Sequence, residues 1–358
     1  MERKLNFSAG PAALPLSVLE QVKEEFVDFN GAGLSLIESS HRTALYDDVH
    51  METMTLIREL MGVSEDYDVM FLGGGATMQF GMIPMNFLKA GGSADYVNSG
   101  AWAKKAIADA KKIGNVNVVW DGADVNYASL PGKVSSSPDA SYFHLTSNET
   151  IGGVQWKEFP ETGNVPLIAD MSSDIMSRPI NVADFGMIYA GAQKNIGPAG
   201  VTLVIMKKEL LESASDRFPA YLTYKNHAAK SSMYNTPPVF PIYVMNLVMK
   251  WLKSLGGIEG IQAINDKKAA LLYSTIDGSK DYYKSPVDTA YRSSMNVVFT
   301  TPSPDLDKKF LSEAADLGMI SLKGYRDVGG CRASIYNAMP LEGVEKLASF
   351  MKDFASKN

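Results

Sequence analysis

Short apolar runs rich in β-branched and aromatic residues recur through the first two thirds of the chain. Each is typical of a buried strand, and the runs are Val69–Leu72, Asp95–Asn98, Val116–Trp120, Tyr142–Leu145, Leu167–Ala169, Met187–Ala190 and Val201–Met206. Stretches with helical periodicity, such as Gln79–Lys89 and Ala101–Ile113, separate several of them. Strands that alternate with helices predict an α/β fold with a mainly parallel, seven-stranded sheet.

The pattern changes character near residue 256. A long apolar helix that includes Tyr243–Lys253 is followed by Leu255, Gly256 and Gly257, a combination that ends helices. The segments after it alternate between helix and strand: Ile258–Leu272, Met295–Thr300, Asp305–Leu317, Arg332–Tyr336 and Leu341–Ala355. We therefore expect a large domain over 16–255, a smaller α+β domain over 256–358 and an N-terminal arm over 1–15.

Charge and composition narrow the classes of partner. The 358 residues carry a formal net charge of −6, and a negative chain repels nucleic acid and anionic membranes. An anionic ligand would therefore need a local cluster of positive side chains. The chain contains no apolar run of about eighteen residues, which a membrane helix would require. A single cysteine, Cys331, fits a reducing compartment, so we expect a cytoplasmic protein without metal, nucleic-acid or membrane partners.

A glycine run lies between a predicted strand and a predicted helix. Gly73, Gly74 and Gly75 precede Ala76 and Thr77. Backbone N–H groups at such a helix start can hold a phosphate. The dinucleotide fingerprint would need a third glycine where Met78 stands, and the Walker motif is absent. By itself the run fits a tight turn as well as a phosphate site.

Asp170 and Lys194 are the candidate chemical groups. Asp170 ends a predicted strand, where open α/β sheets bind ligands, although aspartate there is also a common helix cap. Lys194 stands among small residues that can desolvate its amine and lower its pKa, although a lone lysine is more often a solvated surface residue. A lysine, a carboxylate and an anion site together meet the needs of pyridoxal-phosphate chemistry.

Three of the four histidines and the single cysteine are expected to be structural residues. The four histidines show no metal-ligand spacing, so His50, His144 and His227 are expected to be structural or surface residues. Cys331 lies in a strand-like run beside Arg332, which favours a small buried side chain over a catalytic thiol.

Several segments together resemble the phosphoserine aminotransferase family. The matching segments run from the N-terminal arm to the last predicted strand: Asn6–Ala12, Ser40–Arg42, Gly74–Phe80, Ser147–Ile151, Ala192–Gly200, Tyr234–Pro238 and Arg332–Asn337. Their joint specificity separates this family from other aminotransferases of the same fold. The resemblance implies a fold type I pyridoxal-phosphate transferase.

The resemblance also implies roles for individual residues. Lys194 would form the Schiff base and Asp170 would pair with the pyridinium nitrogen. Trp102 would stack on the ring and Thr150 would bond near the ring oxygen. The cofactor phosphate would be held by Ala76, Thr77 and Gln193, and by Asn235 and Thr236 from the other subunit of a homodimer with shared sites. His41, Arg42, Arg326 and Arg332 would face the substrate, with Arg332 on the α-carboxylate.

One position departs from the family. Its members commonly carry Gly-His-Arg before the last strand, whereas this chain has Gly324, Tyr325 and Arg326. Tyrosine can donate one hydrogen bond but adds no positive charge near neutral pH. The contribution of this segment to phosphate binding is therefore open.

The implied reaction is reversible amino transfer between O-phospho-L-serine and 2-oxoglutarate, giving 3-phosphohydroxypyruvate and L-glutamate in serine biosynthesis. The resemblance extends to 4-phosphohydroxy-L-threonine in pyridoxal phosphate biosynthesis. The alternatives are a related enzyme such as a cysteine desulfurase, with Cys331 as its candidate acceptor, and a non-catalytic binding protein or dinucleotide enzyme.

Overall fold

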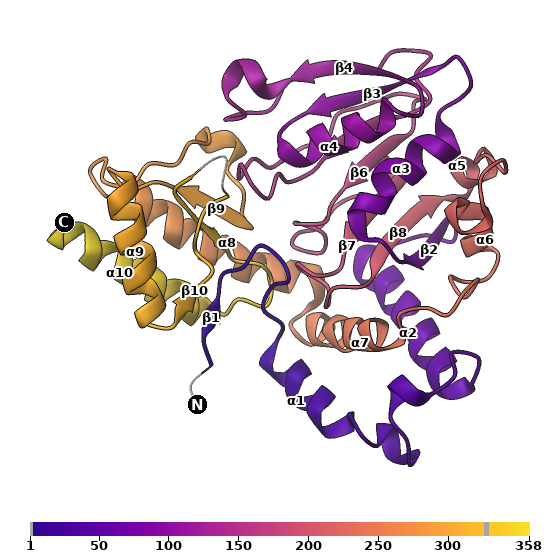
Figure 1. The fold of residues 1–358 in the computed structure, drawn as a ribbon, viewed down its shortest axis with the longest axis horizontal. Helices are drawn as coiled ribbons and strands as arrows, with labels where there is room; N and C mark the ends of the chain where they lie inside the picture. Colours follow the sequence, from indigo (N-terminus) through magenta and orange to yellow (C-terminus); the bar gives the residue numbers. More distant parts are fainter. Residues whose placement is uncertain (1–2, 326–328) are drawn as a thin grey trace.

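A seven-stranded sheet forms the centre of the computed structural model, which describes residues 3–325 and 329–358 (Figure 1). Its strand order is β2-β8-β7-β6-β5-β3-β4. β8 is antiparallel to both neighbours and the other pairs are parallel. The bounds are β2 Tyr67–Leu72, β3 Ser93–Asn98, β4 Asn115–Asp121, β5 Phe143–Thr146, β6 Leu167–Asp170, β7 Met187–Gly191 and β8 Thr202–Lys207. All seven predicted strands are confirmed, as is the mainly parallel α/β sheet.

Helices cover both faces of this sheet. Alternate side chains of a strand point to opposite faces, so Val69 and Phe71 of β2 pack with one hydrophobic cluster while Met70 and Leu72 pack with another. The first cluster contains α2 (Ala44–Met61) and α7 (Val239–Ser254), and the second contains α3 (Gly75–Phe87) and α4 (Ala101–Ala110). Burial on both faces explains the nearly continuous apolar runs of every strand except the edge strand β4, whose residues are exposed or half-buried.

The remaining elements follow the sheet or precede it. They are β1 Leu5–Asn6, α1 Leu16–Glu25, α5 Lys208–Glu212, α6 Tyr224–Ala228, α8 Gly257–Asp277, β9 Asn296–Phe299, α9 Pro304–Asp316, β10 Met319–Ile320, β11 Cys331–Ser334 and α10 Leu341–Lys357. The predicted helices and strands after residue 256 are all present, whereas β1, β10, α1, α2, α5 and α6 were not predicted. The exact division of the chain at residue 256 stays a prediction.

A third hydrophobic cluster holds the C-terminal elements together. It draws on α8, α9, α10, β9 and β11, and also contains Phe7 from the N-terminal arm. Figure 1 shows β1 of that arm beside β10, with which it pairs in parallel. The arm therefore belongs to the packing of the C-terminal elements although it lies at the other end of the sequence.

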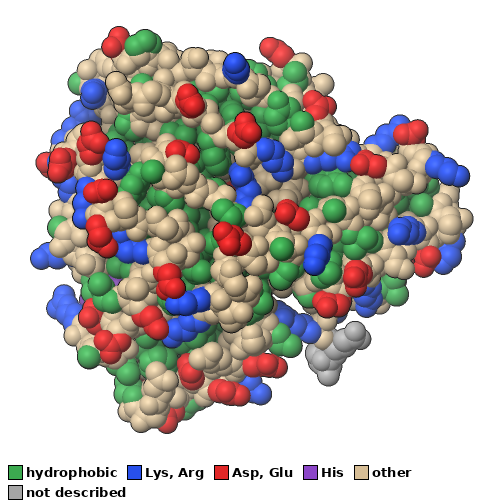
Figure 2. All heavy atoms as spheres, turned by 180° about the vertical axis from the view of Figure 1, so that it is seen from behind, with side chains coloured by type: hydrophobic (Ala, Val, Ile, Leu, Met, Phe, Trp, Pro, Cys, Tyr) green, Lys and Arg blue, Asp and Glu red, His purple; other side chains and the backbone are tan. Residues whose placement is uncertain are grey.

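The surface carries charges of both signs. Figure 2 shows basic and acidic side chains interspersed over one face of the molecule. None of the helices among the described residues combines the length and the apolar character needed to cross a bilayer.

Buried polar side chains connect the C-terminal elements to the sheet. Asn195, next to Lys194, accepts a hydrogen bond from the Asn337 backbone N–H at 3.0 Å and donates to the Ile175 carbonyl at 3.1 Å. Asn265 of α8 donates to the Ser177 carbonyl at 3.1 Å and to Asn337 Oδ1 at 2.8 Å. We call these residues, Asn195, Asn265 and Asn337, the amide bridge.

Lys268 of α8 stabilises the loop that carries Asn337. It is fully buried, and its Nζ donates to the carbonyls of Ile335, Tyr336 and Met339 at 3.0, 2.8 and 3.1 Å. The Tyr336 carbonyl also accepts from the Met339 N–H at 2.9 Å, so the buried carbonyls of Ile335 and Met339 are the two that depend on Lys268 alone.

We predict that Lys268→Met lowers the free energy of unfolding by about 3 kcal/mol, because it leaves the buried carbonyls of Ile335 and Met339 without donors and removes one of the two donors to Tyr336. Chemical denaturation measures the change. Lys267→Met, at the exposed neighbouring position, is the matched control and should change stability by less than about 0.5 kcal/mol. Equal stability of the two variants would contradict the role given to Lys268.

Candidate active site

Lys194 lies in the turn that follows β7, at the carboxyl end of the central strands. Its Nζ donates to Thr150 Oγ1 at 2.7 Å and lies 5.5 Å from the centre of the Trp102 ring. Arg332 of β11 donates from Nη1 to the Thr150 carbonyl at 3.3 Å. The structure thus brings together four residues singled out in the sequence, from the turns after β5 and β7, from α4 and from β11.

The environment of Lys194 favours its neutral form. Burial lowers the pKa of this amine to about 8, although the negative charges of Asp170 and Glu149 oppose the shift. The Arg332 guanidinium acts in the same direction as burial. A larger fraction of neutral amine near neutral pH makes Lys194 a better nucleophile than a solvated lysine.

Asp170 is the last residue of β6 and is 4% exposed. Its Oδ1 accepts from the Ser172 N–H at 2.9 Å and from Ser172 Oγ at 2.6 Å. Ser172 Oγ in turn accepts from the Gly191 N–H at 3.0 Å. Burial raises the pKa of Asp170, while nearby Lys194 and the Ser172 hydrogen bonds lower it.

These bonds leave one oxygen of Asp170 available. Among the described residues, Oδ2 has no hydrogen-bond partner, so it can meet a cationic N–H of a ligand. Sequence analysis missed Ser172, although a serine two residues after an aspartate is a common local hydrogen-bonded turn that signals such a pair.

The glycine run forms the start of α3, where an anion could bind. Gly74 has a φ of 86° and a Cβ there would lie 2.6 Å from Met78 Cβ, so the turn requires glycine. No side chain caps α3. The first-turn N–H groups, which include those of Ala76 and Thr77, are therefore free to bind a phosphate.

The donor set fits pyridoxal phosphate. It supplies an amine at Lys194, a carboxylate at Asp170, an indole face at Trp102 and the start of α3 for a phosphate. Trp102 Nε1 and Arg332 Nε are buried without a partner among the described residues, which leaves two donors for ligands.

The N-terminal arm covers the Lys194 segment. The Ala12 N–H donates to the Gln193 carbonyl at 2.9 Å, and Tyr336 Oη donates to the Ala9 carbonyl at 3.0 Å. A Cβ at Gly10, whose φ is 134°, would lie 3.3 Å from Lys194 Cγ. The arm therefore packs against the lysine that was predicted to hold the cofactor, and Gln193 belongs to the same contact.

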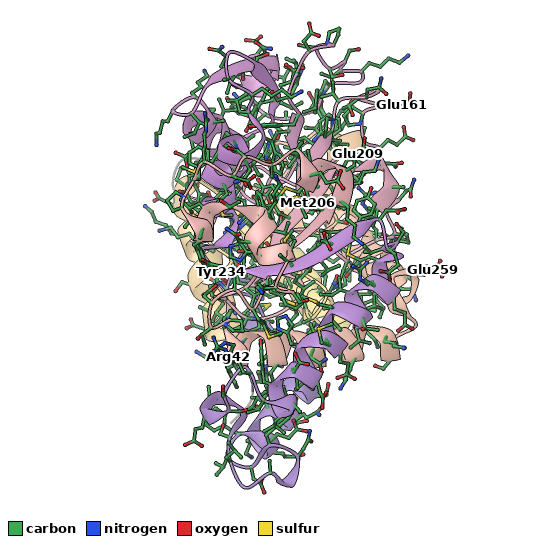
Figure 3. All side chains as sticks on the ribbon, turned by 90° about the vertical axis from the view of Figure 1, so that its right-hand side faces the viewer. Arg42, Glu161, Met206, Glu209, Tyr234 and Glu259 are labelled. Atoms are coloured by element: carbon green, nitrogen blue, oxygen red, sulfur yellow. The ribbon has the colours of Figure 1, made fainter. Side chains whose placement is uncertain are left out.

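Other expected site residues lie apart from this group. Asn235 and Thr236 line a cavity of about 250 Å³ with Gly73, Tyr221 and His227. His41 and Arg42 lie between η2 (Leu36–Glu38) and α2, without a hydrogen bond from their side chains to described residues of the Lys194 group. In Figure 3, Arg42 and Tyr234 lie along one edge of the molecule and Glu259 lies along the other. Arg326 lies outside the described residues.

The other three histidines and the cysteine are structural. His50, His144 and His227 are buried and bond to the Ser231 carbonyl, Tyr189 Oη and the Tyr221 carbonyl. Cys331 is fully buried in β11, and burial raises the pKa of its thiol. Within the described part of the chain, no group of three or more His, Cys, Asp or Glu side chains is arranged to hold a metal ion.

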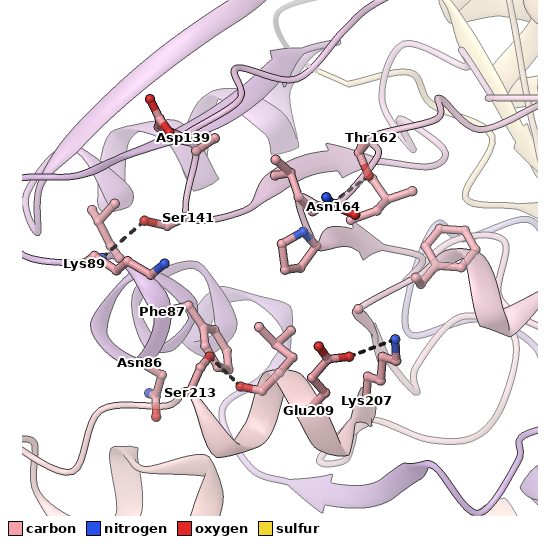
Figure 4. A pocket seen from close by; sticks show the side chains of 18 of the residues that line it. Asn86, Phe87, Lys89, Asp139, Ser141, Thr162, Asn164, Lys207, Glu209 and Ser213 are labelled. Carbon is pink, nitrogen blue, oxygen red and sulfur yellow. Dashed lines mark hydrogen bonds and ion pairs between the residues drawn. The ribbon is translucent and has the colours of Figure 1, made fainter.

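A second cavity, of about 830 Å³, opens at the far end of the sheet (Figure 4). Its walls include Leu167 and Gly186, at the starts of β6 and β7, and Lys207, which is paired to Glu209 at 3.1 Å. Ligands of open α/β sheets bind at the carboxyl ends of parallel strands. The position of this cavity therefore excludes it as the Lys194 site.

Comparisons with known proteins agree with this geometry. Residues 4–347 match the family model for aminotransferase class-V. Phosphoserine aminotransferases of Desulfosudis oleivorans and Bacillus subtilis are 52% and 51% identical, with 100% of this chain covered and 99% and 100% of the relatives.

Solved structures give the same result. A phosphoserine aminotransferase from Bacillus circulans subsp. alkalophilus superposes with a TM-score of 0.98 at 49% identity, covering 100% of this chain and 99% of the other. A phosphoserine aminotransferase from Trichomonas vaginalis with bound pyridoxal phosphate gives 0.93 at 38% identity, covering 98% and 100%. The chain belongs to the class-V aminotransferase family and, within it, to the phosphoserine aminotransferases.

Proposed function

We propose that this chain transfers the amino group between O-phospho-L-serine and 2-oxoglutarate, giving 3-phosphohydroxypyruvate and L-glutamate. The observation that carries the proposal is the Lys194 amine with its lowered pKa, bonded to Thr150 beside the Trp102 ring. The relatives at about half identity, named as phosphoserine aminotransferases, support the substrate. Serine biosynthesis in the cytoplasm is the corresponding role.

The cofactor is pyridoxal phosphate, as in the solved relative that contains it. Lys194 would hold it covalently, Asp170 would pair with its ring nitrogen and Trp102 would stack on its ring. Thr150 would bond near the ring oxygen, and Ala76, Thr77 and Gln193 would hold the phosphate. When bound, the cofactor supplies a ring system that accepts the electron pair left by the substrate α-proton.

The chain's own groups would handle the protons. Lys194, once displaced by the substrate amine, would take the α-proton and return it, because its lowered pKa suits a general base near neutral pH. Asp170 Oδ2 would keep a proton on the ring nitrogen, while Ser172 fixes Oδ1. Arg332, which already bonds to the Thr150 carbonyl, would hold the substrate α-carboxylate.

Positive side chains would select the substrate phosphate. The net charge of −6 means that a dianion has to be bound by local cations, and His41, Arg42 and Arg326 are the proposed group. Tyr325, 40% exposed in the place of the family histidine, would alter this group without removing it.

We further propose a homodimer with shared sites. Asn235 and Thr236 resemble residues that the family contributes across the subunit interface, and Tyr234 beside them is 45% exposed. Exposed Leu16, Phe26 and Val27 add apolar surface suited to an interface.

A cysteine desulfurase is the weaker alternative. Its acceptor would have to be an accessible thiolate, but Cys331 is fully buried in a strand and burial raises the pKa of its thiol. A Cys331→Ala variant that keeps full amino transfer excludes this reaction.

The pH dependence of cofactor attachment tests Lys194. Only the neutral amine attacks the cofactor aldehyde, so the attachment rate to cofactor-free protein should rise about tenfold per pH unit below about 8 and level off above it. Stopped-flow absorbance measures the rate, and mass mapping after borohydride reduction should find the cofactor on Lys194. A rate that continues to rise towards 10.5, the ordinary lysine value, would contradict the site environment.

Hybrid dimers test the shared sites. Lys194→Ala should abolish amino transfer, and a variant with Asn235→Ala and Thr236→Ala should lose most of it. In a hybrid of the two, one site carries both lesions and the other carries none, so about half of the unmodified activity should return. Inactive hybrids, verified by two affinity tags, would contradict subunit sharing.

Phosphate selection is tested at Arg42. Arg42→Ala should lower phosphoserine kcat/KM by about ten- to a hundredfold, because a charge-assisted pair contributes roughly 1.5 to 3 kcal/mol. The kcat/KM for glutamate, which carries the smaller charge, should decrease less. The phosphoserine kcat/KM of Arg42→Lys should lie between those of the unmodified protein and Arg42→Ala. Tyr325→His should improve phosphoserine use chiefly below about pH 6.5, where histidine is charged. Equal use of serine and phosphoserine by the unmodified protein would refute phosphate selection.

A further inference from the structure

Glu149 places a buried carboxylate at the start of α4. The residue is 1% exposed, and its Oε2 accepts from the Trp102 N–H at 3.2 Å. Its Oε1 accepts from the Ala103 N–H at 3.0 Å and from Ser99 Oγ at 3.4 Å. No residue of the helix's own N-terminus supplies a side-chain cap. Glu149, some fifty residues away in sequence, therefore binds the free N–H groups and the positive end of this helix.

The chain before α4 is shaped around this carboxylate. A Cβ at Gly100 would lie 2.7 Å from Glu149 Cδ and 2.9 Å from its Oε2. Any larger residue would push the carboxylate away from the helix. The contact therefore requires glycine at position 100 and a side-chain acceptor as long as glutamate at position 149.

The same contact joins two parts of the active site. Trp102, in the first turn of α4, presents its ring 5.5 Å from Lys194 Nζ. Thr150, the residue after Glu149, accepts from Lys194 Nζ through Oγ1 and from Arg332 through its carbonyl. The backbone of Glu149 is fixed in its own tight loop, through bonds to Val154 and Gly153 at 2.8 and 2.7 Å.

A capping role alone does not account for a buried acid here. Burial raises the pKa of Glu149, while the Ala103 and Trp102 N–H groups oppose that change. Burying a carboxylate costs free energy that a cap at the helix's own N-terminus would avoid, since such caps are solvated. What distinguishes Glu149 from an ordinary cap is that it fixes the distance between Trp102, at the start of α4, and Thr150, the next residue in its own loop.

We propose that Glu149 is a positioning residue, which sets the Trp102 ring relative to Lys194 and Thr150 so that the ring stacks on the cofactor. The proposal rests on the proposed function only through the cofactor. Glu149 would touch neither substrate nor cofactor, and its effect would pass through Trp102.

A double-mutant cycle with Trp102 tests this proposal. Glu149→Gln should weaken pyridoxal phosphate binding about three- to tenfold, because the amide keeps one acceptor and loses the other; Glu149→Ala should weaken it more. Both should reduce the visible circular dichroism of the bound cofactor. In a Trp102→Ala background, each substitution should change affinity less than about twofold, since the residue through which Glu149 acts is gone.

Two comparisons separate positioning from helix capping. Asp95→Asn removes another fully buried carboxylate, which bonds to Ser137, and should lower Tm while leaving cofactor affinity unchanged. Gly100→Ala should weaken cofactor binding as Glu149→Gln does, because the added methyl group displaces the carboxylate. It is the substitute test if Glu149→Ala does not fold. Equal losses of affinity in both Trp102 backgrounds, or a lower Tm with unchanged affinity and dichroism, would overturn the proposal. Failure of the unmodified protein to use phosphoserine would refute the proposed function but leave these binding measurements valid.

Discussion

The structure depends on two neighbouring parallel strands that end at the same edge of the sheet. β6 pairs with β7 so that Asp170 lies opposite Tyr189, and the turn after β7 returns Lys194 towards the same edge. A buried carboxylate and a half-buried amine thereby lie close enough for each charge to shift the pKa of the other. Because burial disfavours both charges, the pair is stable only with further partners, and Ser172 and Thr150 provide them.

The amide bridge extends that constraint to the C-terminal elements. Asn195 follows Lys194 directly and bonds to Asn337, while Asn265 bonds to both the Ser177 carbonyl and Asn337. Amide groups buried in this way have to keep their partners, so a displacement of the C-terminal elements against the sheet would break several bonds at once. Arg332 on β11 is consequently held at a defined place relative to Lys194.

Local sequence patterns could predict the sheet, but not every helix. Six of the strands are buried on both faces and appear as continuous apolar runs, whereas the edge strand β4 is largely exposed and was found from its β-branched and aromatic residues. Helix α2 was missed because its buried side includes His50 and Thr53, which interrupt the apolar periodicity. β1 and β10 have two residues each and pair across more than three hundred positions, so no local pattern marks them.

The residues of the site also differ in whether a local sequence pattern could predict them. Asp170 and Lys194 follow from strand ends and a segment of small residues, whereas roles for Trp102, Thr150 and Arg332 came from the family resemblance. Glu149 and Ser99 gave no signal, because their bond joins segments about fifty residues apart.

The N-terminal arm has a consequence for when the protein becomes competent during its synthesis. Phe7 accepts from the Ser334 N–H, Ala9 accepts from Tyr336, and Gly10 packs on Lys194. The arm is therefore synthesised more than three hundred residues before the residues that it contacts. A nascent chain that has not yet reached residue 334 contains Lys194 and all seven strands of the sheet, but it lacks the partners that hold the arm over Lys194. Contacts of such long sequence separation slow folding, so the complete site is expected to form only after residues 334–336 have been synthesised and have folded against the arm.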